Sequence, residues 1–235
     1  MYDFSLFSAR SLPPLTEDPD SALVCTPGQG EPLCQLDGLW HRVQVQPAYA
    51  RLPGALRGCW LRRSAAERLL AAAAQLPDGY SLLVLDAWRP VRLQQALYDD
   101  FLARLRRENP RTTPWQLEKM CQEFVARPRA DALRPAPHAT GGAVDLTLCL
   151  DGKPVEMGTA FDDFGPLART AALECEPCPN PQARDNRRRL FWAMSEAGFV
   201  NYPGEWWHFC YGERLWAQVT GNQALYSHCD GAGLW

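Results

Sequence analysis

The stretch PHATGGAVDLTLCL, residues 137–150, sets the architecture that we expect for this chain. Its second half, AVDLTLCL (residues 143–150), is an apolar run of strand length and the best strand candidate in the sequence. A Gly-Gly pair comes immediately before it, and glycine tolerates the positive φ that a tight turn needs. The loop residue His138 can therefore fold back beside Asp145 on the strand.

A second short stretch, GEWWHF (residues 204–209), also places a histidine close to a carboxylate. Its aromatic residues favour a strand, which we expect over residues 205–211. Glu205 precedes His208 by three positions, so both side chains can reach one site only if the chain bends, and the preceding Pro-Gly pair supplies a bend. Two of the four histidines in the chain thus lie in compact patterns with a carboxylate.

His138, Asp145 and His208 form a set of side chains that suits zinc. Imidazole nitrogens and carboxylate oxygens bind this metal at roughly 2.0–2.2 Å. Three protein ligands leave the fourth position for water, which is the arrangement of a catalytic rather than a structural zinc site. We therefore predict one zinc ion per chain at these three residues.

Glu205 is the neighbouring carboxylate that the metal does not need. We predict that it is the general base toward water and then the acid toward the leaving amine. The adjacent Trp206 and Trp207 are expected to lower the local dielectric, which raises the pKa of a carboxyl group. Arg89 closes a strand expected over residues 81–88, and we predict that it holds the substrate carbonyl and stabilises the oxyanion.

Each of these residues has a simpler structural explanation when it is taken alone. A lone loop histidine is usually solvated, and we interpret His41 and His228 in that way. Asp145 could make hydrogen bonds at a strand end, Arg89 could form a surface ion pair, and Glu205 could be exposed to solvent. The combination favours a site, because both compact patterns join a histidine to a carboxylate at a junction between a turn and a strand.

The string CEPC, residues 175–178, is a rival metal pattern. Two cysteines separated by two residues form half of a zinc site or a redox pair. No second CxxC or CxxH string lies at the spacing of a zinc finger, and prolines interrupt this one. We therefore expect free thiols at Cys175 and Cys178.

The composition is that of a globular protein. The chain has 235 residues, of which 46% are hydrophobic and 22% charged. A chain of this length can bury a hydrophobic core that needs no disulfides or structural metals for stability. Its net charge of -3 leaves no basic excess, so we expect neither nucleic acid nor an anionic membrane as a partner.

The N-terminal residues do not resemble a secretory signal, and no segment approaches the roughly 18 apolar residues of a spanning helix. We expect a cytoplasmic protein with free cysteines.

Helices and strands are intermixed without strict alternation, which favours the α+β class. Ser64 and Glu67 have the spacing of a capping box at the start of the first long helix. A proline-rich lead segment and a tail from residue 215 flank a core of about residues 40–215, and we expect one domain over residues 1–235. The predicted helices cover residues 64–76, 90–109, 114–126 and 185–198, and the predicted strands cover residues 40–48, 81–88, 143–150 and 205–211.

Several ordered strings together resemble the D-alanyl-D-alanine dipeptidases, zinc enzymes known from vancomycin resistance. These enzymes are related to zinc D,D-peptidases that share a fold with the signalling domain of Hedgehog. The resemblance covers roughly residues 45–211 and implies a single α+β domain, with a small, mostly antiparallel sheet, packed helices and a zinc cleft. The strings are CWLRRSAAERL (59–69), LDAWRP (85–90), HATGGAVDLTL (138–148), MGTAFDDF (157–164), NRRRLFWAMSEAGF (186–199) and EWWHF (205–209).

The resemblance implies hydrolysis of the dipeptide D-alanyl-D-alanine to two D-alanines. It gives the same roles to the five residues discussed above, and it adds Asp162 as the carboxylate that meets the free amino group of the substrate. A turn or a helix N-cap is the competing interpretation for Asp162 and Asp163. The sequence departs from the family at Ala136 and Pro137, where some members carry serines, and at Thr140, where resistance-type members carry a basic residue.

Two other functions remain open at this point. A carboxypeptidase that removes D-alanine from longer cell-wall precursors would need an open cleft and no ammonium-binding carboxylate at Asp162. A zinc-bearing binding module without turnover is the second alternative. The presence of Glu205 argues against the binding module, because a binder has no use for a base beside an open metal position.

Overall fold

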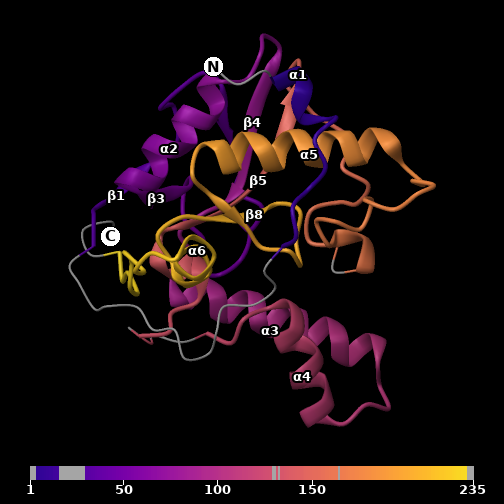
Figure 1. Ribbon diagram of the computed structural model, residues 1–235. Coiled ribbons are helices and arrows are strands. Elements are labelled where there is room, and N and C mark those ends of the chain that lie inside the picture. Colours follow the sequence, from indigo (N-terminus) through magenta and orange to yellow (C-terminus); the bar gives the residue numbers. More distant parts are fainter. Residues whose placement is uncertain (1–3, 16–29, 129–130, 132, 164, 232–235) are drawn as a thin grey trace.

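A six-stranded, mostly antiparallel sheet forms the centre of the protein (Figure 1). The structure, a computed structural model, describes residues 4–15, 30–128, 131, 133–163 and 165–231. The strand order is β2–β4–β5–β8–β7 with β6 paired to β5, and only the β2–β4 pair is parallel. The strands of this sheet are β2 (Val43–Val45), β4 (Tyr80–Asp86), β5 (Ala143–Leu150), β6 (Lys153–Pro154), β7 (Val200–Asn201) and β8 (His208–Cys210). A separate two-stranded sheet joins β1 (Leu33–Gln35) to β3 (Trp60–Arg62).

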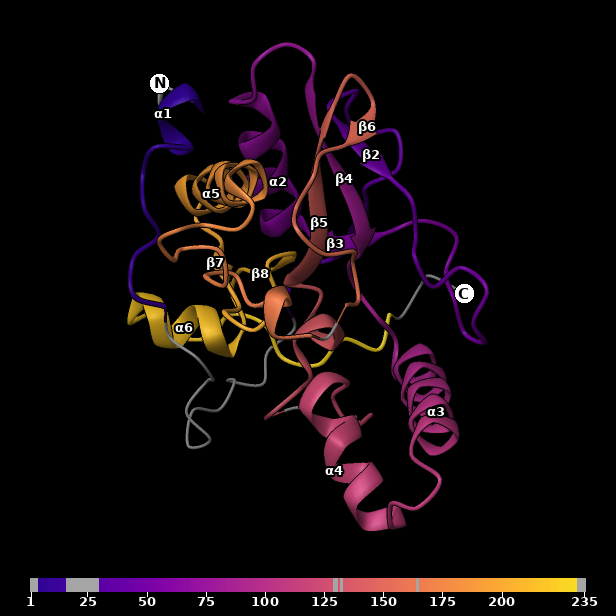
Figure 2. The same ribbon diagram turned by 90° about the vertical axis from the view of Figure 1, so that its right-hand side faces the viewer.

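Two long helices, α2 and α5, lie on one side of the sheet and contact each other (Figure 2). Helices α3 and α4 instead form a hairpin that extends beyond one end of the sheet (Figures 1 and 2). Among the described residues, no helix has both the length and the apolar character that crossing a membrane requires. The α-helices are α1 (Phe4–Phe7), α2 (Arg63–Ala74), α3 (Val91–Glu108), α4 (Pro114–Phe124), α5 (Pro181–Glu196) and α6 (Arg214–Thr220).

The core forms between one face of the sheet and the two covering helices. Alternate residues of β5, among them Leu146 and Leu148, point into it and are fully buried. Leu82 of β4 packs in the same cluster, and α2 contributes buried alanines such as Ala72, whose small side chains let the helix approach closely. Asp145 lies on the opposite face of β5 from these leucines, because successive side chains of a strand alternate.

The α3–α4 hairpin has a small core of its own. Thr113 and Gln116 form a capping box at the start of α4, which fixes where that helix begins. Seven buried side chains then pack between the two helices, apart from the main core. They are Tyr98, Phe101, Leu102, Leu105, Leu117, Cys121 and Val125.

The predicted α+β class, mostly antiparallel sheet and packed helices are confirmed, and several details are corrected. The capping box at Ser64 is wrong: the Ser64 N–H and hydroxyl both donate to the carboxylate of Glu31, from a distant part of the chain. The helix predicted from residue 185 begins at Pro181, where Asn180 caps it. The predicted strand 205–211 is limited to β8, because its first residues form a turn. Helices α1 and α6 lie in the lead segment and the tail, where no element was predicted.

Replacement of Leu148 by alanine is expected to lower the free energy of unfolding by about 2–5 kcal/mol, because it opens a cavity in the core. Leu150→Ala on the same strand is the matched control. Leu150 is 40% exposed, so its loss is expected to stay within about 0.5 kcal/mol. Urea unfolding of both variants measures the difference, and equal losses would contradict this account of the core.

Candidate active site

The pairing of three strands brings site residues into one row. Asp145 of β5 lies opposite Asp86 of β4 on one side and opposite His208 of β8 on the other. Directly opposed residues of antiparallel strands have Cβ atoms about 4.5–5.5 Å apart. The two pairings therefore place a carboxylate, a second carboxylate and an imidazole side by side at this end of the sheet.

His138 joins the row from the short 3₁₀ helix η1 (Pro137–Thr140) that precedes β5. Gly141 follows with a φ of 76°, and a Cβ at Gly142 would lie 2.3 Å from a backbone oxygen, so the predicted glycine turn is present. The Nδ1 atom of His138 donates to the carbonyl of Ala87 at 2.7 Å. This bond fixes the ring and leaves the Nε2 lone pair directed into the site.

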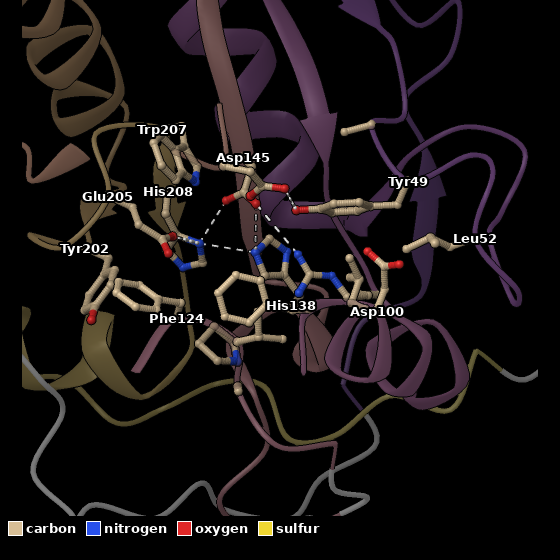
Figure 3. A pocket seen from close by; sticks show the side chains of 18 of the residues that line it. Tyr49, Leu52, Asp100, Phe124, His138, Asp145, Tyr202, Glu205, Trp207 and His208 are labelled. Atoms are coloured by element: carbon tan, nitrogen blue, oxygen red, sulfur yellow. Dashed lines mark hydrogen bonds and ion pairs between the residues drawn. The ribbon is translucent and has the colours of Figure 1, made fainter. Parts of the chain in front are cut away.

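The predicted metal ligands converge in the interior (Figure 3). Nε2 of His138 lies 3.2 Å from Nδ1 of His208, and that nitrogen lies 2.9 Å from Oδ1 of Asp145. The other carboxylate oxygen of Asp145 lies 3.3 Å from Nε2 of His138. All three ligand atoms lie within 4.8 Å of one another and all three residues are buried.

This donor set fits zinc. Two nitrogens that each bind a tetrahedral zinc at 2.0–2.1 Å are roughly 3.3 Å apart, close to the 3.2 Å between the two imidazoles. Burial alone would raise the pKa of Asp145, but His138 and His208 hold it well below its usual range, so the carboxylate is ionised as a metal ligand must be.

The CEPC string is not part of the candidate metal cluster found among the described residues. Within the described part of the chain, the three residues His138, Asp145 and His208 are the only cluster with the donor types and spacing of a metal site. Cys175, Cys178 and six other cysteines are free thiols, as predicted for them, and Cys25 lies outside the described residues.

Glu205 reaches the site through the predicted bend. Its backbone N–H donates to Tyr202 O at 3.1 Å, and the side chain of Asn201 holds both this turn and the start of β8. One carboxylate oxygen of Glu205 lies 3.9 Å from Nδ1 of His208. Burial, supported by the nearby Asp145 charge and opposed by that of His208, raises the pKa of Glu205 to about 7.

Of the two tryptophans after Glu205, only Trp207 lines the cavity with it. Trp206 is buried in the main core, and its ring N–H donates to Thr159 at 2.9 Å. The predicted apolar surrounding of Glu205 therefore comes from one indole rather than two.

Arg89 lies in the interior and not in a surface ion pair. Two of its N–H groups donate to Asp86, at 2.8 Å from Nε and 2.6 Å from Nη2, and Nη1 donates to Gln94 at 2.8 Å. Nη2 also lies 3.8 Å from Asp145. Although burial disfavours the charged form, these carboxylates and Tyr49 raise the pKa of Arg89, so the guanidinium stays charged beside the predicted metal ligands.

Asp162 lines the same cavity and accepts a hydrogen bond of 2.6 Å from the hydroxyl of Tyr49. Burial raises the pKa of Asp162 to about 6, and the hydrogen bond from Tyr49 opposes that rise. Its φ of 61° is unusual for a residue other than glycine. The competing turn interpretation applies to Asp163, which accepts from the backbone N–H of Gly165 at 3.0 Å.

The cavity has a volume of about 540 Å³, and the predicted residues occupy only part of its wall. Tyr49 and Leu52 come from the loop after β2, and Figure 3 shows them on one side of the predicted metal ligands with Phe124 on another. Sequence reasoning also missed Asp86, which stands three positions before Arg89, and the contribution of the α3–α4 hairpin. The hairpin residues on this wall are Leu97, Asp100, Phe101, Arg104, Gln122 and Phe124, with Val125 and Ala126 after α4.

The C-terminal tail supports the loop that carries His138. Cys229 N donates to Ala139 O at 2.8 Å, and Cys229 O accepts from the indole of Trp88 at 3.1 Å. Thr140, at a position where the sequence departs from the resistance-type enzymes, is buried and donates to Pro137 O. Its hydroxyl therefore stabilises the loop and does not face a ligand.

The two remaining histidines lie outside the cavity lining. His41 is exposed, as predicted. His228 is partly buried, and its Nδ1 atom is buried without a hydrogen-bond partner in the structure, which corrects the expectation that it is solvated.

Known proteins match this chain over most of its length. The family model described as D-ala-D-ala dipeptidase matches residues 35–225. The chain belongs to this family. The D-alanyl-D-alanine dipeptidase of Synechocystis sp. is 36% identical over 182 residues, covering 71% of this chain and 73% of the relative. The D-alanyl-D-alanine dipeptidase of Enterococcus faecium is 33% identical over 154 residues, which cover 61% of this chain and 69% of the relative.

Among solved structures, VanYB in complex with D-alanine-D-alanine is 18% identical in sequence to this chain, with a TM-score of 0.46. The matched region covers 86% of this chain and 93% of the VanYB chain. For a member of the D-alanyl-D-alanine dipeptidase family, the donor set described above indicates a metallo-dipeptidase with zinc as its cofactor. The resemblance first seen in six short strings is therefore confirmed at the level of the family.

His138→Ala is expected to weaken zinc binding by more than the roughly 10–100-fold that the loss of a residue supporting a ligand costs. His41→Ala, which removes an exposed imidazole, is the matched control and should bind like the wild type. Zinc content after dialysis and competition with a chromogenic chelator measure the effect. Retention of one full equivalent of tightly bound zinc by His138→Ala would exclude this residue as a ligand.

Proposed function

We propose that the protein hydrolyses free D-alanyl-D-alanine to two D-alanines, with His138, Asp145 and His208 as zinc ligands. The observation that carries this proposal is that the Asp162 carboxylate, bonded by Tyr49, lines the same cavity as the three ligands and Glu205. A carboxylate in that place is a suitable partner for an ammonium group. A dipeptide is the kind of substrate whose free amino group lies next to its only peptide bond. The names of the relatives in the family support the choice of D-alanine residues.

Zinc, when bound with an open position, supplies the Lewis acidity that polarises the scissile carbonyl and makes water a better nucleophile at neutral pH. Glu205 accepts the proton of the attacking water, because a pKa of about 7 lets it be ionised at the start of the reaction. The same carboxyl then returns the proton to the amine nitrogen of the leaving D-alanine. Buried surroundings that raise the pKa of Glu205 thus suit both steps.

Arg89 stabilises negative charge on the carbonyl oxygen in this proposal. The guanidinium has five N–H groups, and three of them are used by Asp86 and Gln94. The remaining donors make no hydrogen bond to another described residue and can reach a developing oxyanion, and the fixed partners orient the group in advance. Removal of one such donor typically costs about 10²–10³-fold in rate.

Asp162 would bind the ammonium group of the substrate, with the Tyr49 hydroxyl holding its carboxylate. This assignment favours a dipeptidase over the alternative carboxypeptidase, because a longer peptide has no ammonium group at that position. The position of Asp162 in the same cavity as the three metal ligands supports it. The third alternative, a zinc-bearing module without turnover, is disfavoured by the placement of Glu205 within 3.9 Å of His208.

We also propose that the protein acts in the cytoplasm on dipeptide from peptidoglycan metabolism, as one domain over residues 1–235, without nucleic-acid or membrane partners. The free thiols of the eight described cysteines suit a reducing compartment. The net charge of -3 does not favour polyanions. Fractionation of the producing cells tests the location, and a single cooperative unfolding transition tests the domain count.

The function is tested by D-alanine release from the zinc-loaded protein, offered either D-alanyl-D-alanine or its N-acetyl derivative. We expect release from the free dipeptide alone, because acetylation removes the charge that Asp162 binds. Release from the blocked substrate would establish the carboxypeptidase. No release from either substrate, with one zinc bound per chain, would overturn the proposed reaction and favour the binding module or a different dipeptide as substrate.

Glu205→Gln belongs in the same assay. It should keep zinc and lower kcat for the dipeptide by about 10²–10⁴-fold, the usual contribution of general acid–base catalysis. Glu67→Gln, an exposed change on α2, serves as the matched control. A Glu205→Gln protein with near wild-type turnover would overturn the proposed proton transfer.

The KM for D-alanyl-D-alanine should depend on pH through Asp162. Its pKa of about 6 means that the carboxylate is charged above that pH and is neutralised as the pH falls. Tyr49, Arg89, Asp86 and Asp145 are the other groups that set this value. We therefore expect a KM that is constant above about pH 7 and rises about tenfold per pH unit below about pH 6.

Steady-state kinetics from pH 5 to 8 on zinc-saturated protein measures this dependence. Asp162→Asn is the informative variant, because it should have a high KM that no longer changes over this range. If the KM of Asp162→Asn still rises as the pH falls below about 6, the titrating group is not Asp162.

A further inference from the structure

Arg187, in the middle of α5, is buried at 3% exposure although none of its hydrogen bonds goes to a carboxylate. Its guanidinium donates to three backbone carbonyls: from Nε to Met157 at 2.7 Å, from Nη2 to Leu167 at 2.8 Å and from Nη1 to Arg169 at 2.8 Å. Burial lowers its pKa to about 10, so the side chain is still protonated at neutral pH. Among the described residues, this buried charge donates hydrogen bonds only to the backbone, and the nearby Glu156 charge opposes the fall of its pKa only in part. Such an arrangement calls for a structural explanation.

The three carbonyls belong to the two ends of one segment, residues 157–163 and 165–169, which we call the Asp162 loop. Met157 stands at its start, and Leu167 and Arg169 stand at its end. The rigid fork of a guanidinium can hold carbonyls on both sides at once, which the single ammonium group of lysine does less well. Arg187 therefore closes the base of the loop that presents Asp162 to the cavity.

Asp162 needs such support. Its φ of 61° lies in the left-handed region, which costs a residue with a Cβ free energy and persists only where the surroundings impose it. Contacts of Phe161 with Trp207 and Tyr49, at 5.4 and 6.0 Å between ring centres, fix the tip of the loop. The Arg187 bonds fix its base, and charged donors make hydrogen bonds roughly twice as strong as neutral ones.

The base of the loop is also joined to the turn that carries Glu205. The backbone N–H of Trp206 donates to Ala168 O at 3.0 Å, and its indole N–H bonds Thr159. The Arg187 guanidinium lies 5.8 Å from the centre of the Trp206 ring. Arg187 itself does not line the cavity, so any effect that it has on substrate must pass through these neighbours.

We propose that Arg187 is a positioning residue for substrate recognition, which holds the Asp162 loop so that the Asp162 carboxylate meets the ammonium group of the dipeptide. This rests on the proposed function, because it assumes that Asp162 binds that group. Arg187 sets affinity for a free amino terminus and leaves zinc binding unchanged.

The test measures affinity for D-alanyl-D-alanine by calorimetry in the zinc-loaded full chain carrying Glu205→Gln, which binds without appreciable turnover. Arg187→Met should weaken binding at least tenfold, and Arg187→Lys should restore part of the loss. Arg188→Met is the matched control. It removes the next guanidinium of α5, which bonds Glu174 and Ser8 and not the Asp162 loop, and should stay within twofold of the parent.

A double variant separates positioning from general stability. If Arg187 acts through Asp162, adding Arg187→Met to Asp162→Asn should weaken binding less than twofold beyond Asp162→Asn alone. Zinc content should be the same in all variants. If Arg187→Met does not fold, the same comparison is made with Arg187→Lys.

An Arg187 variant within twofold of the parent, or losses that multiply in the double variant, would overturn the role of Arg187 while leaving the proposed function intact. A parent that does not bind D-alanyl-D-alanine at all would instead overturn the proposed function and this inference with it. The two failures are therefore distinguishable in one set of titrations.

Discussion

The register of β5 between its two neighbours is the constraint on which the rest of the structure depends. In that register Asp145 stands between Asp86 and His208, while Leu146 and Leu148 face the core. A slip of one residue would turn Asp145 into the apolar core and the leucines into the cavity. The hydrophobic face of one strand thus fixes both the packing of the helices and the position of the proposed metal ligand Asp145.

The site concentrates negative charge. Asp86, Asp145, Asp162 and Glu205 lie close enough to influence one another's pKa values or those of their shared neighbours, and Arg89 is the guanidinium that lies among them. Burial is the main cause of the raised pKa values of Asp162 and Glu205. Asp145 is buried as well, but its two imidazole neighbours lower its pKa. A divalent cation at the three ligands would offset part of this charge.

Local patterns in the sequence were sufficient for the class of fold and for the residues that converge on the metal site. His138 and Glu205 could be predicted because each stands beside a turn that glycine or proline encodes, and the structure has both turns. Asp162 was identified only through family resemblance, since nothing in its own segment predicts a place in the cavity. The capping box at Ser64 failed because Glu31, far away in the sequence, satisfies the same backbone group.

What local patterns could not provide is which elements surround the metal. Periodicity predicted the helices α3 and α4 almost within their true bounds, but it carries no information on where a helical hairpin docks. The role of Tyr49 depends on a hydrogen bond to a residue more than a hundred positions away. Interactions of this range arise from tertiary packing, so they follow from the fold and not from the segment itself.

The separate core of the α3–α4 hairpin has a consequence for how this enzyme family can diversify. One wall of the cavity is built by a unit whose buried side chains do not interleave with those of the main sheet. Residues on that wall, such as Leu97 and Phe124, can change size or polarity at little cost to the strands that carry Asp145 and His208. The main sheet and the turns next to it carry the proposed residues of the reaction, and the α3–α4 hairpin shapes one wall of the substrate cavity. Selection can therefore change the shape of the cavity without changing the residues of the reaction.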